Sequence, residues 1–494
     1  MTALVVLIAL LPLATTATAI TGAKARVAGY TAIAAGCGSL GLSIWLLLWI
    51  GGHRVLSALS GFVYVDGLSA FFLFTVAVVV LLSSLGSAAY LRAQENSGQL
   101  SSFQVRMYFG FFGAFAALML ASLSTGNLGM LFVLIEASTL ASAALVGLEA
   151  QASSLEAAWK YVIISSLGVT IALVGTMFLF YSGTGLALTD NLRLTWPYLF
   201  QHASELAHPA LKLAFLLAVV GYGTKVGLAP MHTWLPDAHS EAPSPTSAML
   251  SAALLNTGMY AIIRFLAIAR TGLGTHYVQV VMLSFGFASV LIGALFLVTT
   301  TNFKRLFAYS SVEHMGIIAI ALGFGGQLGL YGAMLHTLNH AIGKAVLFLT
   351  SGDIVLGYRT REATKVRGLL TTLPLSGTVL MLTTFAILGS PPFGLFLSEL
   401  TILRAGFANG GVWLPLALLL LLVIAFVAFA RRTVPMIVGE PETHTQALRP
   451  YATGEQRVLA ALPIVTGLTA LLVLGLWIPT GLHTVILGSI GALT

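Results

Sequence analysis

Long apolar segments follow one another along this 494-residue chain, and only short polar stretches separate them. Charged residues make up 8% of the sequence, whereas an ordinary globular protein carries roughly 25%. A bilayer span needs about 20 apolar residues, and the chain offers about 14 such segments. The pattern predicts an all-α polytopic membrane protein. It excludes a soluble domain with a single anchor.

The polar stretches are too short to form soluble domains, so we expect one membrane domain over residues 1–494. We interpret residues 1–20 as a first transmembrane helix rather than a signal peptide, because no positively charged residue opens their apolar run. The predicted spans begin near Thr2, Ala28, Asp66, Met107, Asn127, Ala157, Leu211, Ala242, Tyr277, Leu306, Leu330, Thr371, Val412 and Val458.

The net charge of +7 does not indicate a nucleic-acid partner, because the basic residues lie in short loops. If the N-terminus is outside, most of them fall in inward loops, as the positive-inside rule requires. This distribution predicts that both termini lie outside. The single cysteine, Cys37, cannot form an intrachain disulfide or hold an iron–sulfur cluster alone.

One lysine stands out among the apolar segments. A helix from about Leu211 carries Lys225 into the bilayer, where a charge costs about 2.5–3.5 kcal/mol and usually marks an ion path. Gly227 and Pro230 then interrupt the helix, and a broken helix at membrane depth is typical of transporter sites. The polar segment that follows contains His232, Asp237, His239 and Glu241.

A second predicted helix, from Thr371, is interrupted at Pro391 and Pro392, and Glu399 follows the break. Interrupted helices at corresponding places in two halves of a chain predict two inverted repeats, each with a site at its break. The alternative is a pair of unrelated proline kinks. Glu399 itself is either part of an ion path or an interfacial carboxylate.

Glu136 is the single charged residue near the middle of its predicted span, and Lys225 is its natural partner. A coupled pair would exchange protons, whereas the alternative is a static ion pair that fixes helix packing. Lys160 begins the next helix. It either tunes this pair or extends to the membrane surface.

His336, His340 and Lys344 recur every four residues and therefore share one helix face. Neutral imidazoles both donate and accept, so this face favours proton relay over a packed polar network. Zinc would need a third protein ligand, and that face offers no carboxylate, so we predict no metal. Glu313 and His314 would continue the line.

Three further carboxylates, Asp66, Asp237 and Asp353, lie near predicted span ends and are weaker candidates. The sequence contains no nucleophile elbow or phosphate-binding loop, so we expect no catalytic site in this chain.

These residues resemble the antiporter-like membrane subunits shared by respiratory complex I, the Mrp antiporters and energy-converting nickel–iron hydrogenases. The resemblance rests on Glu136, on Lys225 and on two stretches, PMHTWLPDAHSEAPSPTSAML from Pro230 and HTLNHAIGKAVLFLTSGD from His336. The run YSSVEHMGII from Tyr309 is most similar to the hydrogenase-4 component F branch.

The resemblance implies a proton-translocating subunit of a membrane redox complex in a bacterial or archaeal inner membrane. Residues 126–432 would form its antiporter-like core. Iron–sulfur clusters, and a nickel–iron centre in the hydrogenase branch, would reside in partner subunits, which include other membrane subunits and a peripheral redox arm. Alternatives are a cation/proton antiporter that moves sodium without redox chemistry, and a scaffold that does not transport.

The resemblance also implies roles for single residues. Glu136 and Lys225 would form the first half-channel, and Glu399 would serve the second. The central axis between them would contain His336, His340 and Lys344. Many relatives have lysine or histidine where this chain has Asn256, and an asparagine can hold water but cannot carry the proton itself.

Overall fold

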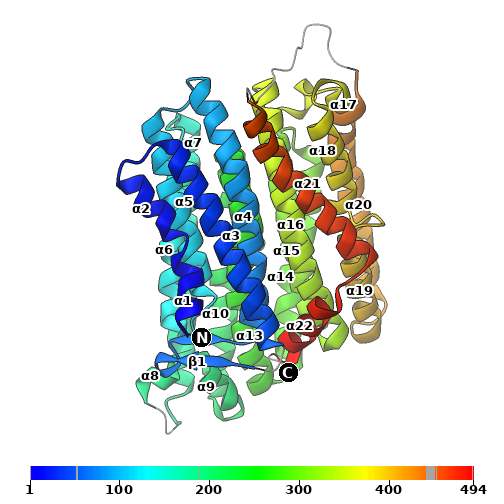
Figure 1. Ribbon diagram of the computed structural model, residues 1–494. Coiled ribbons are helices and arrows are strands. Elements are labelled where there is room, and N and C mark those ends of the chain that lie inside the picture. Colours follow the sequence, from blue (N-terminus) through cyan, green and yellow to red (C-terminus); the bar gives the residue numbers. More distant parts are fainter. Residues whose placement is uncertain are drawn as a thin grey trace.

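The computed structural model describes residues 2–51, 54–186, 189–440, 451, 453–491 and 493. They form a bundle of long, roughly parallel helices with one short antiparallel hairpin, β1 (Leu56–Ala58) and β2 (Val63–Val65), in which Leu56 lies opposite Val65 (Figure 1). The hairpin lies at the end of the bundle where α1 (Thr2–Leu10) begins and α22 (Thr480–Gly491) ends. We call this the terminal end.

Within the described residues, twelve helices are long and apolar enough to cross a membrane, which confirms the prediction of an all-α polytopic membrane protein. These are α3 (Ala25–Ile50), α4 (Gly67–Asn96), α5 (Ser102–Ser122), α6 (Leu128–Val146), α7 (Ala152–Ser182), α10 (His208–Val226), the continuous segment Ser244–Leu273, α14 (Thr275–Thr299), α15 (Phe303–Phe324), α16 (Gly326–Tyr358), α20 (Trp413–Val438) and α21 (Gly454–Leu476).

The predicted number of about 14 is approximate. The first predicted span is a bent pair, α1 and α2 (Leu13–Ile20), which meet at 44° and bring the number of spans to 13 if they count as one. The span predicted near Thr371 is the apolar helix α18 (Pro374–Ile387), followed after a break by α19 (Gly394–Asn409).

The segment Ser244–Leu273 combines α12 (Ser244–Met249), a π-helical turn η3 (Leu250–Leu254) and α13 (Leu255–Leu273). Shorter elements connect the spans. They are η1 (Leu59–Gly61), α8 (Asp190–Arg193), α9 (Trp196–Gln201), η2 (Ala203–Glu205), α11 (Trp234–Glu241), η4 (Ala363–Lys365) and α17 (Leu369–Thr372).

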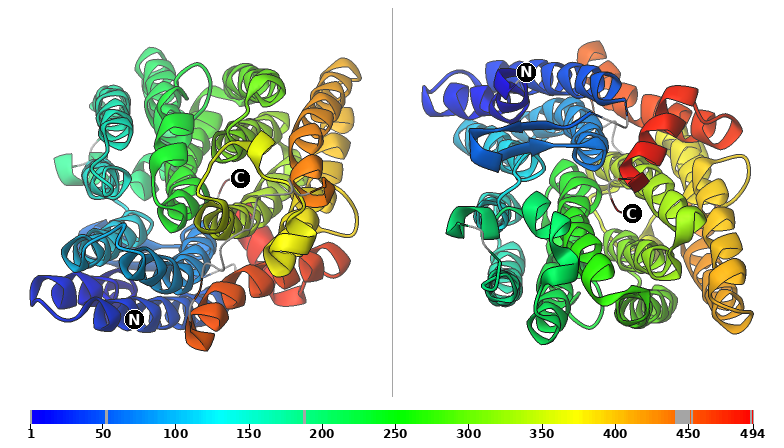
Figure 2. Two further views of the ribbon diagram at one scale, coloured as in Figure 1. Left: turned by 90° about the horizontal axis from the view of Figure 1, so that it is seen from above. Right: turned by 90° about the horizontal axis from the view of Figure 1, so that it is seen from below.

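Seen along the bundle, the chain runs around it in sequence order, so the last helices lie beside the first (Figure 2). The segments Ser244–Leu273 and α15 are 100% and 94% buried over their most apolar parts, whereas α20 is 28% buried. The core therefore lies among α12, α13 and α15. The exposed apolar faces of the peripheral helices suit contact with lipid or with other membrane subunits.

Both predicted breaks are confirmed. Helix α10 ends where Gly227 adopts a left-handed φ of +81°, and α18 is followed by Gly389 at +61°. Glycine tolerates this conformation, and the prolines that follow, which lack an N–H, cannot continue the helix. The two broken helices begin at opposite ends of the bundle, as inverted repeats require (Figure 1).

Candidate functional site

The first break places a buried ammonium group among neutral partners. The side chain of Lys225 is fully buried, and its Nζ donates to Thr139 Oγ1 at 2.6 Å and to the Tyr161 hydroxyl at 2.8 Å. Nζ also lies 4.8 Å from the centre of the Tyr161 ring. The Tyr161 hydroxyl continues to Ser142 Oγ at 2.7 Å. The lysine is therefore solvated by hydroxyl groups rather than by a carboxylate.

Glu136 does not form the direct ion pair with Lys225 that the sequence suggested, because no described carboxylate lies within 4 Å of that ammonium group. Glu136 instead accepts a hydrogen bond from Ser166 Oγ on α7, and its second oxygen has no described partner. Thr139 lies one turn along α6 from Glu136 and binds Lys225. The two charges are thus linked through a hydroxyl group.

Small polar groups lie between the two halves of the bundle. Ser251 lies in the π-helical turn, and its hydroxyl is 2.8 Å from that of Ser311 on α15. Single π-helical turns often occur at functional sites. Asn256 is fully buried; its amide nitrogen donates to the Ala252 carbonyl at 2.7 Å, and its side-chain oxygen has no described partner. A buried acceptor of this kind needs water or a transient donor.

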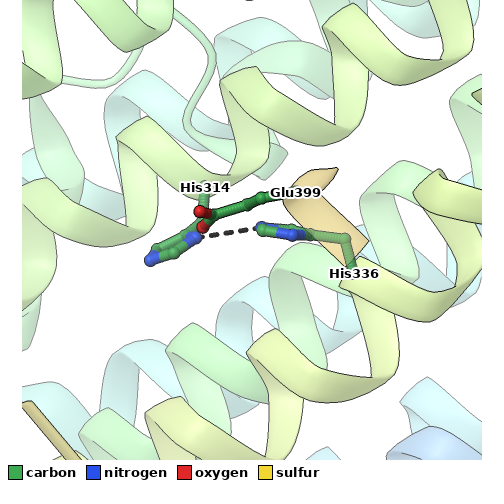
Figure 3. Close-up of side chains that lie close together, drawn as sticks. All are labelled: His314, His336 and Glu399. Atoms are coloured by element: carbon green, nitrogen blue, oxygen red, sulfur yellow. Dashed lines mark hydrogen bonds between the residues drawn. The ribbon is translucent and has the colours of Figure 1, made fainter. Parts of the chain in front are cut away.

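The second break faces three imidazoles. His314 Nδ1 lies 2.9 Å from His336 Nε2, and His336 Nδ1 lies 2.9 Å from Ser398 Oγ on α19. The Glu399 carboxylate reaches over the same two rings (Figure 3). The ring of His340 lies 5.4 Å from that of His314, and neither of its nitrogens has a described partner.

Lys344 is the counterpart of Lys225 in this half. It is fully buried, and its ammonium group donates to the Phe307 carbonyl at 3.1 Å and to the Ser310 hydroxyl. No described carboxylate lies within 4 Å of it. His336, His340 and Lys344 lie on one face of the uninterrupted helix α16, as their spacing predicts, and all three are completely buried.

The left-handed glycine at the second break makes room for the carboxylate. A Cβ atom at Gly389 would lie 2.0 Å from Glu399 Oε2. The same two residues line a cavity of about 240 Å³ between α18, α19 and α20. Glu313 is 5% exposed and lies on the neighbouring helix α15. The break thus brings Glu399 to the imidazoles and leaves space beside it.

Lys160 and Asp237 lie outside this buried line, which agrees with the alternative that Lys160 extends to the membrane surface. The Lys160 side chain is 48% exposed and pairs with Glu156 at 2.6 Å and with Asp237 at 3.5 Å. Asp237 also pairs with Arg305. The reason is position: Lys160 lies near the beginning of α7, at the end of the bundle opposite the terminal end, where its ammonium group remains accessible.

The other weaker candidates are dispersed. His232 lies between α10 and α11 against the rings of Phe296 and Tyr309. His239 is fully buried against Trp234 and Phe348.

Asp353 is bound by two hydroxyl groups, those of Ser376 at 2.9 Å and Tyr451 at 2.5 Å. Neither of these two partners is one of the imidazoles, so Asp353 lies apart from the histidine cluster.

Sequence reasoning did not identify Arg264 as part of a buried ion pair. The Arg264 side chain is completely buried, donates to both Asp66 oxygens at 2.6 and 2.8 Å, and stacks 3.8 Å from the Trp196 ring. Burial raises the pKa of Asp66, but the charge of Arg264 and its hydrogen bonds outweigh burial and hold that pKa below its usual value. Asp66 also caps α4 through the Ser69 N–H.

Sequence reasoning also missed the hydroxyl groups that form hydrogen bonds with the two lysines, with Glu136 and with His336. They are Thr139, Tyr161, Ser166, Ser310 and Ser398. Their one signal in the sequence is a small polar residue in an otherwise apolar span, and many such residues merely bond to their own helix.

Comparison with known proteins gives matches over most of the chain. The family model described as NADH:quinone oxidoreductase/Mrp antiporter, transmembrane, matches residues 125–425. The hydrogenase-4 component F homolog of Methylacidiphilum infernorum is 37% identical over 391 residues, which are 79% of this chain and 82% of that protein. The F(420)H(2) dehydrogenase subunit N of Methanosarcina mazei is 30% identical over 427 residues, or 84% of this chain and 81% of that protein.

A solved structure shares the fold. A chain in the structure of the Mrp complex from Dietzia sp. DQ12-45-1b superposes with a TM-score of 0.83 at 21% identity, and the alignment covers 99% of this chain and 97% of that chain.

Proposed function

Because the chain belongs to the NADH:quinone oxidoreductase/Mrp antiporter transmembrane family, we propose that it is the proton-translocating subunit of a membrane redox complex of the hydrogenase-4 or NADH:quinone oxidoreductase kind. One observation carries this proposal. Two lysines are fully buried, Lys225 just before the first helix break and Lys344 on α16 in the second half, and among the described residues each forms hydrogen bonds with neutral groups alone.

Neutral partners leave a buried lysine able to exchange its proton. An ammonium group bound to a buried carboxylate would be fixed by that charge, whereas hydroxyl and carbonyl oxygens stabilise the charged form only moderately. A change in the charge of a nearby group then determines whether the lysine keeps its proton. Glu136, one turn from the Lys225 contact, and Glu313, on the helix that contacts Lys344, are placed to apply such a shift.

In this proposal a proton first passes along the hydroxyl groups near Lys225. It then crosses the polar groups of Ser251, Asn256 and Ser311, and continues along the second half of the bundle. The carriers there are Lys344 and the imidazoles, with Glu399 at the far side. A hydroxyl or neutral imidazole can accept a proton on one side and release another on the other side. Water would bridge the position of Asn256, because an amide does not titrate.

The partners follow from the same proposal. The chain holds a single cysteine, so iron–sulfur clusters, and a nickel–iron centre in the hydrogenase branch, would reside in other subunits of a peripheral arm. Residues 126–432 would contain the ion path. We place the chain in a bacterial or archaeal inner membrane with both termini outside, because the basic loop residues gather at the end opposite the terminal end.

The test is proton uptake by the intact complex in sealed vesicles with its electron donor and acceptor. Lys225→Ala should lower uptake per electron by about 100-fold or more, the scale at which a positioned proton-transfer group contributes. Lys160→Ala is the matched control, because Lys160 is a surface lysine outside the path. Equal uptake by wild type and Lys225→Ala would remove Lys225 from the mechanism.

The two alternatives predict other outcomes of this experiment. A cation/proton antiporter would exchange sodium for protons without electron donor, and the complex would purify without a redox subunit. A scaffold would give unchanged proton flux when Glu136→Gln and Lys225→Ala are combined. The subunits that co-purify in mild detergent distinguish the first alternative directly.

A further inference from the structure

Three potential metal ligands converge on one point in the second half of the bundle. His314 comes from α15, His336 from α16 and Glu399 from α19, and one ligand atom of each lies within 4.8 Å of the other two. In Figure 3 the Glu399 side chain extends past the two rings, and its carboxylate lies beside the ring of His314. The prediction of no metal considered the face of one helix only, whereas the fold supplies the missing carboxylate from another helix.

The ring of His336 is held from the side away from this point, because its Nδ1 lies 2.9 Å from Ser398 Oγ. Histidines that bind metal usually bond in this way through their second nitrogen, which fixes the tautomer and the ring orientation. The remaining nitrogens, His314 Nδ1 and His336 Nε2, face each other at 2.9 Å.

A small adjustment converts this hydrogen bond into a metal site. Zinc binds nitrogen at about 2.0–2.1 Å, so two tetrahedral nitrogen ligands lie about 3.3 Å apart. The two nitrogens would separate by a few tenths of an ångström and lose the shared proton. The Glu399 side chain has the space to follow, because it lines the cavity of about 240 Å³.

The surroundings offer further donors and a second negative charge. His340 is completely buried, its ring lies 5.4 Å from that of His314, and neither nitrogen has a described partner. Glu313 lies near enough to Glu399 to interact with it electrostatically. Lys344 is the positive group that faces the cluster from α16, and two carboxylates would offset the charge of a divalent ion beside it.

We propose that His314, His336 and Glu399 bind a divalent transition-metal ion such as Zn²⁺, with His340 as the fourth donor. Neutral imidazoles with one carboxylate are a donor set that zinc prefers, whereas magnesium and calcium prefer oxygen alone. We further infer that the bound ion blocks proton passage, because it occupies the nitrogens that would exchange protons. This second part rests on the proposed function.

Binding is tested with Co²⁺ as a spectroscopic probe on the purified, chelator-treated complex. Wild type should bind one ion with the visible absorption of a tetrahedral nitrogen and oxygen site. His314→Gln, His336→Gln and Glu399→Gln should each weaken binding by at least about 100-fold, while His276→Gln, an exposed histidine outside the cluster, should not. An absent tetrahedral spectrum, or equal binding by the three variants and wild type, would overturn the site.

Ser398→Ala keeps every proposed ligand and tests the positioning of His336. We expect about tenfold weaker Co²⁺ binding with an altered spectrum, because the ring loses its orienting partner. The thermal midpoints of the variants show whether each one is folded. A folded Ser398→Ala variant with wild-type affinity and spectrum would contradict the ligand role of His336.

Inhibition is measured separately. Zn²⁺ should suppress proton uptake by the wild-type vesicles over the concentration range in which it displaces Co²⁺, and a chelator should restore uptake. Full uptake at saturating Zn²⁺ would overturn the blocking role. If uptake without zinc does not depend on Lys225, the proposed function fails, and the Co²⁺ titration still decides the metal site.

Discussion

Two buried cations in this molecule have opposite surroundings. Arg264 lies between two aromatic rings and donates to both oxygens of Asp66, so its charge is fully compensated. Lys225 is equally buried, yet its partners are the hydroxyl groups of Thr139 and Tyr161. The sequence does not distinguish the two residues, because each is a basic residue in an apolar helix.

The difference separates a structural charge from one that can move. A guanidinium group keeps its proton under all conditions found in proteins, and a bidentate carboxylate fixes its geometry. Neutral oxygens stabilise the charged form of an ammonium group less strongly than a carboxylate does, so the group can lose its proton more easily. The Arg264 cluster therefore fastens α4 to α13 near the terminal end, while the lysines provide exchangeable protons deeper in the bundle.

The largest effect should follow from breaking the compensated pair. Arg264→Met leaves Asp66 buried without its partner, and removal of one member of a buried pair typically costs about 3–5 kcal/mol. We expect a strongly lowered thermal midpoint in detergent and poor assembly. Arg270→Met is the control, because Arg270 lies on the same helix and has no ion pair with any described residue.

The same substitution at Lys225 is the counterpart of this experiment. Lys225→Met removes a cation that no carboxylate compensates, so the folded protein should be as stable as wild type or more stable. If Arg264→Met and Lys225→Met shift the thermal midpoint equally, the two cations do not differ in how their charge is compensated.

The next largest effect concerns the second lysine. Lys344→Met should leave the thermal midpoint at or above that of wild type and lower proton uptake by about 100-fold, which corresponds to about 2.7 kcal/mol. Uptake per electron in vesicles measures this effect, and Lys212→Met, a lysine near the beginning of α10, provides the control. Normal pumping by Lys344→Met would mean that the imidazoles conduct without the lysine.

Tyr161→Phe removes one of the two hydrogen bonds to Lys225 and leaves the ring in place. A hydrogen bond to a charged group contributes about 1.5 kcal/mol, so uptake should fall by roughly tenfold. Tyr181→Phe, an exposed tyrosine on the same helix, should have no effect. If Tyr161→Phe pumps normally, the ring alone is sufficient to hold the ammonium group, and the hydroxyl chain to Ser142 is not a route.

Much of the fold could be predicted from the sequence because the bilayer imposes simple rules. Apolar length defined the spans, and glycine with proline defined the breaks after Lys225 and before Glu399. The number of spans was less certain, because α18 is too short on its own and α1 and α2 form a bent pair.

The site was only partly predictable, because helix periodicity relates residues within one helix and not between helices. It correctly placed His336, His340 and Lys344 on one face. It could not show that His314 reaches His336 from α15, or that Thr139 lies between Lys225 and Glu136. It also could not distinguish Arg264, whose carboxylate partner lies almost 200 residues away in the sequence.

The smallest effect belongs to an ion pair of intermediate burial, Glu241 with Arg361, whose atoms lie 2.6 Å apart. Burial raises the pKa of Glu241, but the charge and hydrogen bond of Arg361 outweigh it and lower the pKa below its usual value. A lowered carboxyl pKa contributes stability above about pH 4.3, the unfolded value, and this contribution is lost as the pH falls further.

Glu241→Gln should therefore cost about 0.5–1 kcal/mol at pH 7 and nothing near pH 3, as measured by thermal midpoints across pH. Glu205→Gln, an exposed carboxylate, should show no such dependence, and an equal cost at both pH values would mean that packing rather than charge stabilises Glu241.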